Sequence, residues 1–492
     1  MKTCFFSLFL FFLTSLGVFA QTINGKVIDT NTALPIPNVT IQVSKNIGSF
    51  TDENGLFNIQ ISNSKKVIFS CLGYQTRTIA IDSLKILNFI VKLKESENNL
   101  EEVVLGNHKI SFDSIMQSVR YYLKVNYSDL PKKRTIFMRY TNQPDFKKVD
   151  FELDRNTLIS RKRRKLANKD FEAFSSKLKK TKTSFSADYY GNYYSKIVEA
   201  SKRKRFLSSK IDSIQGYRLL NNNEDITLES VQANAQILFL SQLNKQKTYK
   251  LKSGLFKLED SVSIIKVSKE LKANKDSINL SQFSEKLSDL IQGFRFTNKK
   301  NSTNFLDNYY YKHQIIDTLS TNSSTIYVVS FSPKRSKAKY NGKLYIDADD
   351  YAITKIEYQF AKGKKGTNLN LRLLLGVKFS ENFKKGALLF KKGPTGFYQL
   401  THAKEKEGRY FYLNRSLKFI ENSKAREKVK FGFKIEGNFY GTTEMVVIKT
   451  ELIDNKTFNK KININKGRVL TKKEYDTTTW KNAKLLQQYQ KQ

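Results

Sequence analysis

Short alternations of apolar and polar residues recur about every ten residues between residues 21 and 105, and they limit the possible fold more than any other feature. Such alternation places one face of a strand in a core and the other face in water. Turn residues separate the alternating segments, as at 51–55, where Asn54 and Gly55 can adopt the left-handed conformation. The spacing predicts a β-sandwich. Its expected strands lie at residues 23–29, 39–43, 56–59, 67–72, 79–81 and 87–93.

Four motifs follow one another in this segment: GKVID at 25–29, PIPNVTI at 35–41, TDENGLF at 51–57 and FSCLGY at 69–74. Together they resemble the carboxypeptidase regulatory-like domain, which stands at the start of many Gram-negative envelope proteins. The resemblance implies a transthyretin-like β-sandwich without catalytic residues of its own. It also implies an association with the outer membrane, because the domain commonly precedes TonB-dependent-type barrels of that membrane.

The first 20 residues have the pattern of a cleavable signal peptide. Lys2 supplies the positive charge, Phe5–Val18 is mainly apolar, and Val18-Phe19-Ala20 fits the cleavage pattern. A membrane anchor is the alternative, but the apolar run is shorter than the roughly 20 residues that span a bilayer. We therefore expect export, a mature chain beginning at Gln21 without a transmembrane helix, and a place in the periplasm or at the outer-membrane periphery.

The mature chain then retains one cysteine. Cys4 lies in the leader and not at the cleavage site, which leaves Cys71. A single cysteine cannot form an intramolecular disulfide. Because Cys71 ends an apolar strand pattern, the prediction is a buried structural thiol.

The net charge of +41 (86 basic minus 45 acidic residues) is distributed unevenly. Residues 21–105 hold eight Lys or Arg and eight Asp or Glu, so the surplus lies in residues 106–492. Such a region should be attracted to lipid head groups, acidic glycans or nucleic acid. The signal peptide argues against nucleic acid as the natural partner.

The heaviest basic runs lie at 161–165, 177–182 and 202–205, and the last two flank Tyr189, Tyr190, Tyr193 and Tyr194. Cationic side chains can bind phosphate or sulfate while aromatic rings stack. A solvated Lys-rich surface that reflects a biased composition is the simpler interpretation, and we favour it. The candidate anion-binding residues are Arg161, Lys162, Arg163, Arg164, Lys165, Lys202, Arg203, Lys204 and Arg205.

Beyond an acidic linker at 95–107, we expect a mixed helical and basic region at 108–300 and an antiparallel β-rich region at 301–492. Apolar stripes predict helices at 112–123, 228–242 and 283–291, and residues 475–489 suggest a short terminal helix. The first 94 residues then comprise the leader (1–20) and the sandwich (21–94). The predicted fold class is multidomain: an all-β sandwich followed by an α+β body.

Strand patterns dominate after residue 308. They lie at 325–331, 342–347, 351–360, 369–379, 397–402, 410–420, 429–435 and 443–452. The segment 309–360 resembles the middle of envelope proteins that carry the same N-terminal domain. Its hairpin at 342–360 is similar to one in half-barrel lipoprotein carriers, so the large sheet could take a half-barrel form. A membrane barrel is a further alternative, which Lys residues on both faces of the late strands disfavour.

The sequence offers no strong catalytic motif. His402 and Glu405 have the spacing of a zinc pair, but a third ligand is required, and the other histidines, His108 and His313, lie far upstream. We also expect His402 to lie between a strand and a turn rich in Lys and Glu. Residues 363–367 lack the P-loop spacing, 52–55 lacks most of a calcium loop, and no nucleophile elbow occurs. Asp349 and Asp350 fall in a turn, although spacing alone leaves glycosidase chemistry open.

We therefore expect a non-enzymatic exported envelope protein without cofactor or metal. It would bind an anionic lipid, an anionic glycan or an envelope protein. The alternatives are a hydrolase acting on envelope polymer and a structural subunit of an envelope complex.

Overall fold

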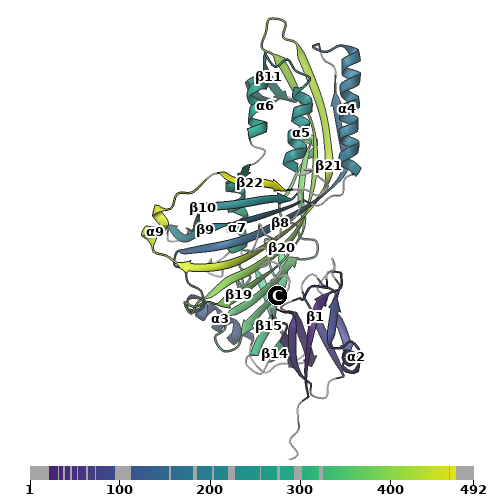
Figure 1. Ribbon diagram of the computed structural model, residues 1–492. Helices are drawn as coiled ribbons and strands as arrows, with labels where there is room; N and C mark the ends of the chain where they lie inside the picture. The colour runs from purple at the N-terminus through teal and green to yellow at the C-terminus, as the bar shows by residue number, and fades with distance from the viewer. Residues whose placement is uncertain are drawn as a thin grey trace, which may run out of the picture. The chain divides into compact units, whose positions relative to one another are not determined.

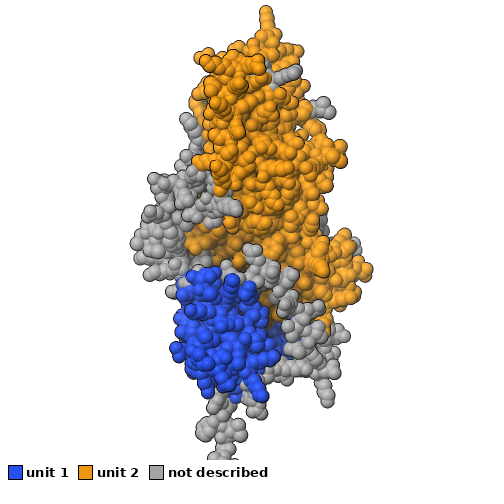
Figure 2. Space-filling model, turned by 90° about the vertical axis from the view of Figure 1, so that its right-hand side faces the viewer, with its two compact units in different colours: residues 1–107, 316–328, 485–492 blue, residues 108–315, 329–484 orange. Residues whose placement is uncertain are grey.

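The computed structural model describes part of the chain. It covers residues 21–472 except 32, 37–38, 45–46, 53, 62–64, 72–73, 95–111, 155–156, 181–184, 202–203, 220–227, 255, 274–276, 293–301, 321–324 and 465. The predicted signal peptide, the linker at 95–107 and the terminal helix at 475–489 therefore lie outside the described residues. The chain forms two compact units, one of residues 1–107, 316–328 and 485–492 and the other of 108–315 and 329–484 (Figure 2).

The N-terminal part of the first unit contains two small sheets. Their orders are β4-β1-β7 and β3-β2-β5-β6. The inward-facing residues of both sheets form one core, in which the rings of Phe57 and Phe69 lie 5.5 Å apart. The elements are β1 (Gln21–Asp29), β2 (Thr40–Ser44), β3 (Ile47–Phe50), β4 (Leu56–Ile61), β5 (Lys66–Ser70), β6 (Arg77–Ala80), α2 (Ile81–Ile86) and β7 (Ile90–Leu93).

The predicted sandwich is confirmed, with two local corrections. Ile81 begins helix α2 instead of continuing a strand, and α2 buries Leu84. Cys71 follows β5 and is partly buried against the core, so it is not the fully buried thiol that we predicted. At the turn before β4, Gly55 has a φ of +70° and a Cβ there would lie 2.6 Å from the carbonyl oxygen of Val27, so this position requires glycine.

The second unit is built on one large sheet with helices packed against it (Figure 1). The strands of this sheet are β8 (Lys132–Leu153), β9 (Phe185–Ser201), β10 (Lys204–Leu219), β11 (Thr248–Ser253), β12 (Phe256–Ser263), β13 (Ser277–Asn279), β14 (Tyr311–Ser320), β15 (Thr325–Pro333), β16 (Tyr340–Asp347), β17 (Ile353–Phe360), β18 (Asn368–Leu371), β19 (Val377–Lys392), β20 (Tyr398–Glu421), β21 (Lys428–Leu452) and β22 (Lys466–Lys472). Residues 316–328 of β14 and β15 are counted with the first unit. The helices are α3 (Phe112–Asn126), α4 (Arg161–Lys180), α5 (Leu228–Leu240), α6 (Ile264–Ala273), α7 (Leu280–Gln292), α8 (Arg372–Leu375) and α9 (Asn455–Lys460).

The main path of this sheet is β13-β22-β10-β9-β8-β21-β20-β19-β17-β16-β15-β14. Neighbouring strands from β10 to β16 run antiparallel, whereas β10 and β22 are parallel. The antiparallel sheet and the α+β body are thus confirmed. The predicted helices correspond to α3, α5 and α7. Among the described residues, no helix is both long and apolar enough to span a membrane.

We call the narrow extension of the sheet the arm. It consists of the outer ends of β8, β20 and β21 with β11, β12, α4, α5 and α6, which Figure 1 shows side by side. Aromatic residues hold the helices on the strands: the Phe431 ring of β21 lies 4.7 Å from Phe239 of α5 and 6.4 Å from Phe171 of α4. These side chains belong to one continuous apolar core.

The strand pattern differs from the prediction in the centre of the sheet. The two strands expected at 397–402 and 410–420 are one strand, β20, and those at 429–435 and 443–452 are also one, β21. The expected strand at 369–379 is interrupted by the single turn of α8. The region 108–300 contains the long strands β8, β9 and β10 as well as helices, because strand pairing with β21 provides partners that local sequence does not reveal.

Substituting Gly342 by Ala should lower the denaturation midpoint of the second unit. A Cβ at Gly342 would lie 1.9 Å from the carbonyl oxygen of Glu357 and 2.7 Å from the Phe331 ring, so the backbone must shift at a cost of about 1–3 kcal/mol. Urea denaturation followed by circular dichroism measures this. Gly432→Ala is the matched control, since no atom lies within 4 Å of its added Cβ. Equal shifts for both variants would contradict the steric explanation.

Candidate functional site

The basic run at 161–165 forms the beginning of α4, in the arm. Arg161, Lys162, Arg163 and Lys165 are exposed, and Arg164 is half-buried. No ion pair joins any of the five to another described residue, and the first turn of α4 contains no acidic residue. Cations at a helix N-terminus oppose the helix dipole, so this placement does not serve the stability of α4. The positive charge of this run is therefore exposed to solvent.

The structure describes the basic run at 202–205 only in part. Lys204 and Arg205 begin β10, although their side chains are not described, and Lys202 and Arg203 lie outside the described residues. Ser195 of β9 pairs with Lys132, the first residue of β8, and the hairpin from β9 to β10 lies beyond this pair. Helix α4, in contrast, follows the last residue of β8. A strand of 22 residues spans about 70 Å, so the structure does not combine the two runs in one site.

The tyrosines between the basic runs do not form a stacking surface. Tyr189, Tyr193 and Tyr194 are buried in β9. Tyr189 packs 4.9 Å from the Phe283 ring of α7, and the Tyr193 hydroxyl bonds to Ser288 of the same helix. Tyr189 and Tyr193 thus hold α7 on the sheet, while the Tyr194 hydroxyl donates a hydrogen bond of 2.7 Å to Asp212. The idea that these three rings stack on a polyanion is therefore wrong.

A buried group of charged residues, which sequence analysis missed, lies where α7 meets the sheet. We call Lys286, Tyr358, Lys384, Glu405 and Glu407 the ionic cluster. The Lys286 Nζ lies 2.9 Å from Glu405 Oε1 and 3.3 Å from Glu407 Oε2. Glu405 also accepts a hydrogen bond of 2.8 Å from the Tyr358 hydroxyl and lies 3.5 Å from the Lys384 ammonium. The cluster thus joins a helix to three strands of the sheet.

Electrostatics keep Glu405 and Lys286 ionised. Burial raises the pKa of Glu405, but the charges of Lys286 and Lys384 outweigh it and hold the pKa below the ordinary value. Burial lowers the pKa of Lys286, and Glu405 and Glu407 outweigh it and raise that pKa. A carboxyl that acts as general acid needs a raised pKa instead. The geometry is therefore that of an ion-pair network.

The His402–Glu405 spacing does not make a metal site. The two residues lie within β20, not beside a turn as we expected, and a separation of three places them on opposite faces of a strand. His402 Nε2 lies 3.4 Å from Glu444 Oε1, while Glu405 belongs to the ionic cluster. His313 is also engaged, 2.6 Å from the carbonyl oxygen of Phe305. Among the residues that the structure describes, no group of His, Cys, Asp or Glu could hold a metal ion.

More acidic than basic residues are buried in the second unit, so the proportion of basic residues is higher at its surface than in its sequence. Among its described residues, the buried acidic ones are Asp188, Glu357, Glu405, Glu407, Glu421 and Glu444, and the buried basic ones are Lys132, Arg134, Lys355 and Lys385. Several of these carboxylates have short ion pairs, such as Asp188 with Arg139 at 2.8 Å and Glu357 with Lys355 at 2.9 Å. Because more negative than positive charge is buried, the excess of positive charge lies at the surface.

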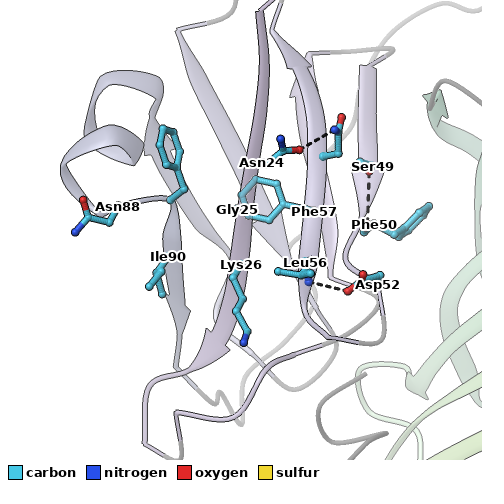
Figure 3. A pocket seen from close by; sticks show the side chains of 12 residues that line it. Asn24, Gly25, Lys26, Ser49, Phe50, Asp52, Leu56, Phe57, Asn88 and Ile90 are labelled. Carbon is cyan, nitrogen blue, oxygen red and sulfur yellow. Dashed lines mark hydrogen bonds between the residues drawn. The ribbon is translucent and has the colours of Figure 1, made fainter.

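The first unit has an open hollow of about 660 Å³ over its three-stranded sheet (Figure 3). Leu56 and Ile90 line it from the two outer strands, Lys26 lies between them on the central strand β1, and Asp52 lies in the turn before β4. The Asp52 carboxylate accepts hydrogen bonds from the backbone amides of Asn54 and Leu56, both at 2.8 Å. It therefore shapes the turn and is not poised for acid–base chemistry.

Sequence signals for the ionic cluster were present but ambiguous. Glu405 and Glu407 alternate with lysines in a stretch that resembled a charged turn. Lys286 lies in the predicted third helix, on the side of the apolar stripe formed by Phe283, Leu287 and Leu290. A Lys beside an apolar stripe indicates a partner of opposite charge in the core, and this pattern could have predicted an ion pair at Lys286.

The fold and these surfaces define a two-unit, β-rich protein whose first unit is a small sandwich and whose second unit is basic. Residues 23–105 match the family model of the CarboxypepD_reg-like domain, which confirms the resemblance drawn from the four motifs. No curated protein matches the chain.

Two solved structures are similar in part. One is a domain assigned to an outer membrane lipoprotein-sorting protein of Vibrio parahaemolyticus, with 8% identity, coverage of 71% of this chain and 97% of that chain, and a TM-score of 0.25. The other is assigned as a membrane-associated protein of Bacteroides fragilis NCTC 9343, with 7% identity, coverage of 86% and 98%, and a TM-score of 0.11. Both scores are too low to relate the folds.

Proposed function

We propose that this chain is a non-enzymatic, exported protein of the cell envelope that binds an anionic envelope component through its second unit. The observation that carries the proposal is the cationic start of α4, where Arg161, Lys162, Arg163 and Lys165 are exposed without an ion-pair partner among the described residues. Among the described residues of the same unit, six acidic but only four basic residues are buried, so burial adds slightly to the positive charge that faces solvent. Lipid head groups and acidic glycans are the components with complementary charge.

The N-terminal domain and the leader support the envelope as the location. The CarboxypepD_reg-like domain at 23–105 resembles a module of envelope proteins, and residues 1–20 have the pattern of a signal peptide. The ionic cluster supports a binding role over catalysis, because its carboxylates are neutralised by lysines and Glu405 has a lowered pKa. In this proposal the first unit is an interaction module for an envelope protein.

Replacing Arg161, Lys162, Arg163 and Lys165 together with Gln should weaken binding to anionic vesicles at least tenfold. Each cation near a charged membrane contributes about 1 kcal/mol, so the loss of four exceeds this bound even when only some of them touch the surface. The measurement is co-sedimentation of the chain without residues 1–20 with vesicles that contain phosphatidylglycerol, and, separately, affinity for a soluble acidic polysaccharide.

The matched control replaces four exposed lysines of the first unit with Gln: Lys66, Lys85, Lys92 and Lys94. Its net charge then equals that of the α4 variant. We expect it to bind like the unaltered chain. If the control loses as much affinity as the α4 variant, net charge alone explains binding. If the unaltered chain binds neither the vesicles nor the polysaccharide, the proposed function is wrong.

A further inference from the structure

The hairpin of β18 and β19 presents two leucines to solvent at its tip. Leu373 and Leu374 of α8 are 102% and 82% exposed, and Leu369 on β18 is 43% exposed. Fully exposed large apolar side chains that adjoin one another are unusual on a soluble surface and mark sites of interaction. We call Leu373 and Leu374 the leucine tip.

The base of this hairpin is well fixed, so the exposure is built into the fold. Leu371 pairs with Val377 across the two strands. Gly376 ends α8 with a φ of +63°, and its carbonyl oxygen accepts a hydrogen bond of 2.7 Å from the Asn414 amide of β20. The Arg372 guanidinium lies 4.3 Å from the centre of the Tyr412 ring. A Cβ at Gly376 would lie 2.0 Å from the Asn414 carbonyl oxygen, so only glycine permits this close approach.

Positive charge adjoins the leucine tip. Residues 361–380 contain five basic residues and no acidic residue. Arg372 precedes the two leucines, and Lys378 follows on β19. Two carboxylates of the same sheet are engaged: Glu381 of β19 accepts a hydrogen bond from the Thr367 amide at 2.7 Å, and Glu436 of β21 accepts one from the Tyr410 hydroxyl at 2.9 Å.

We propose that the leucine tip inserts into the surface of an anionic phospholipid bilayer, with Arg372 and Lys378 at the level of the head groups. This inference rests on the proposed function and names the bilayer as the anionic component. Two leucine side chains offer far less apolar area than the roughly 800 Å² per partner of a stable protein interface. A bilayer requires no complementary shape, and apolar side chains framed by cations are typical of interfacial binding.

Replacing Leu373 and Leu374 with Ser should reduce partitioning to phosphatidylglycerol-containing vesicles about tenfold or more, because burial of each leucine side chain favours the bound state by about that factor. The matched control is Ile86→Ser with Ile462→Ser, which removes two apolar side chains that are 82% and 78% exposed elsewhere. The control should partition like the unaltered chain. Thermal unfolding of all variants should agree, because none of these side chains is buried.

The depth to which the leucine tip enters the bilayer is tested with Leu374→Trp, by measuring how strongly brominated phospholipids quench the tryptophan fluorescence. The unaltered chain contains one tryptophan, Trp480, which gives the background, and Ile462→Trp is the comparison. Strong quenching of Leu374→Trp alone supports insertion. Retained vesicle binding by the Ser variant together with absent quenching overturns the insertion but leaves the proposed function intact. Binding to the acidic polysaccharide without binding to any vesicle has the same consequence.

Discussion

Replacing Lys286 with Met should destabilise the second unit by about 3 kcal/mol. The substitution leaves Glu405 and Glu407 buried without the ammonium that lies within 3.3 Å of both, and breaking one side of a buried ion pair typically costs 3–5 kcal/mol. We expect the lower end of this range because Lys384 and Arg409 still face the two carboxylates. Urea denaturation of the second unit measures the effect.

The charge of Lys286 can be separated from the packing of its stem by pH. The pKa of Glu405 is lower in the folded chain than its ordinary value of about 4.3, so its contribution to stability is present above that pH and is lost as the pH falls through the folded-state pKa. The difference between Lys286→Met and the unaltered chain should therefore shrink below about pH 4. Lys257→Met, which removes an exposed partner of Asp260, should have little effect. A difference that stays constant into acid would assign the stabilisation to the aliphatic stem.

Replacing Phe431 with Ala should destabilise the arm by about 4 kcal/mol. Phe431 is fully buried and its ring contacts Phe171, Phe239 and Phe419, so truncation leaves a large cavity between the strands and the helices α4 and α5. Hydrogen exchange measured by mass spectrometry should show faster exchange in α4 and α5 than in β16 and β17.

Phe256→Ala provides the control for Phe431→Ala, because Phe256 also lies in the arm but is 53% exposed. Its effect should stay within about 0.5 kcal/mol. If exchange after Phe431→Ala rises equally in every described helix and strand of the second unit, the arm and the broad part of the sheet unfold as one body. That result would contradict a separate core in the arm.

Local sequence predicted the elements whose partners are close in the chain. In the first unit, alternation and turn residues specify the two sheets, and the four motifs lead to the correct domain. In the second unit, helices α3, α5 and α7 and the hairpin of β16 and β17 follow from apolar periodicity. These patterns are decisive because each element buries one continuous stripe.

The prediction failed where charged residues lie inside the sheet. Lys404–Arg409 were read as part of a turn, yet they continue β20 because Glu405 and Glu407 meet Lys286 from a distant helix. Val149-Asp150-Phe151-Glu152-Leu153 alternates apolar and acidic residues, as the end of β8 requires. We did not predict this strand, because we interpreted the segment with the basic run that follows it. Helix α4, which begins with the candidate cations at 161–165, was not predicted, and the separation of these residues from the start of β10 is set by strand pairing.

The order of the large sheet has a consequence for how the chain is made. Strand β21 pairs Phe431 with Leu153 and Leu452 with Lys132, so its partners on β8 are 278 to 320 residues earlier in the chain. Such contacts are slow to form because a long loop must close first. One edge of β8 therefore stays unpaired during synthesis until nearly the whole chain is available, and open edges invite pairing with other chains. Holding such a chain unfolded until its last strands arrive avoids this pairing, and the export that we propose for this protein would have that effect.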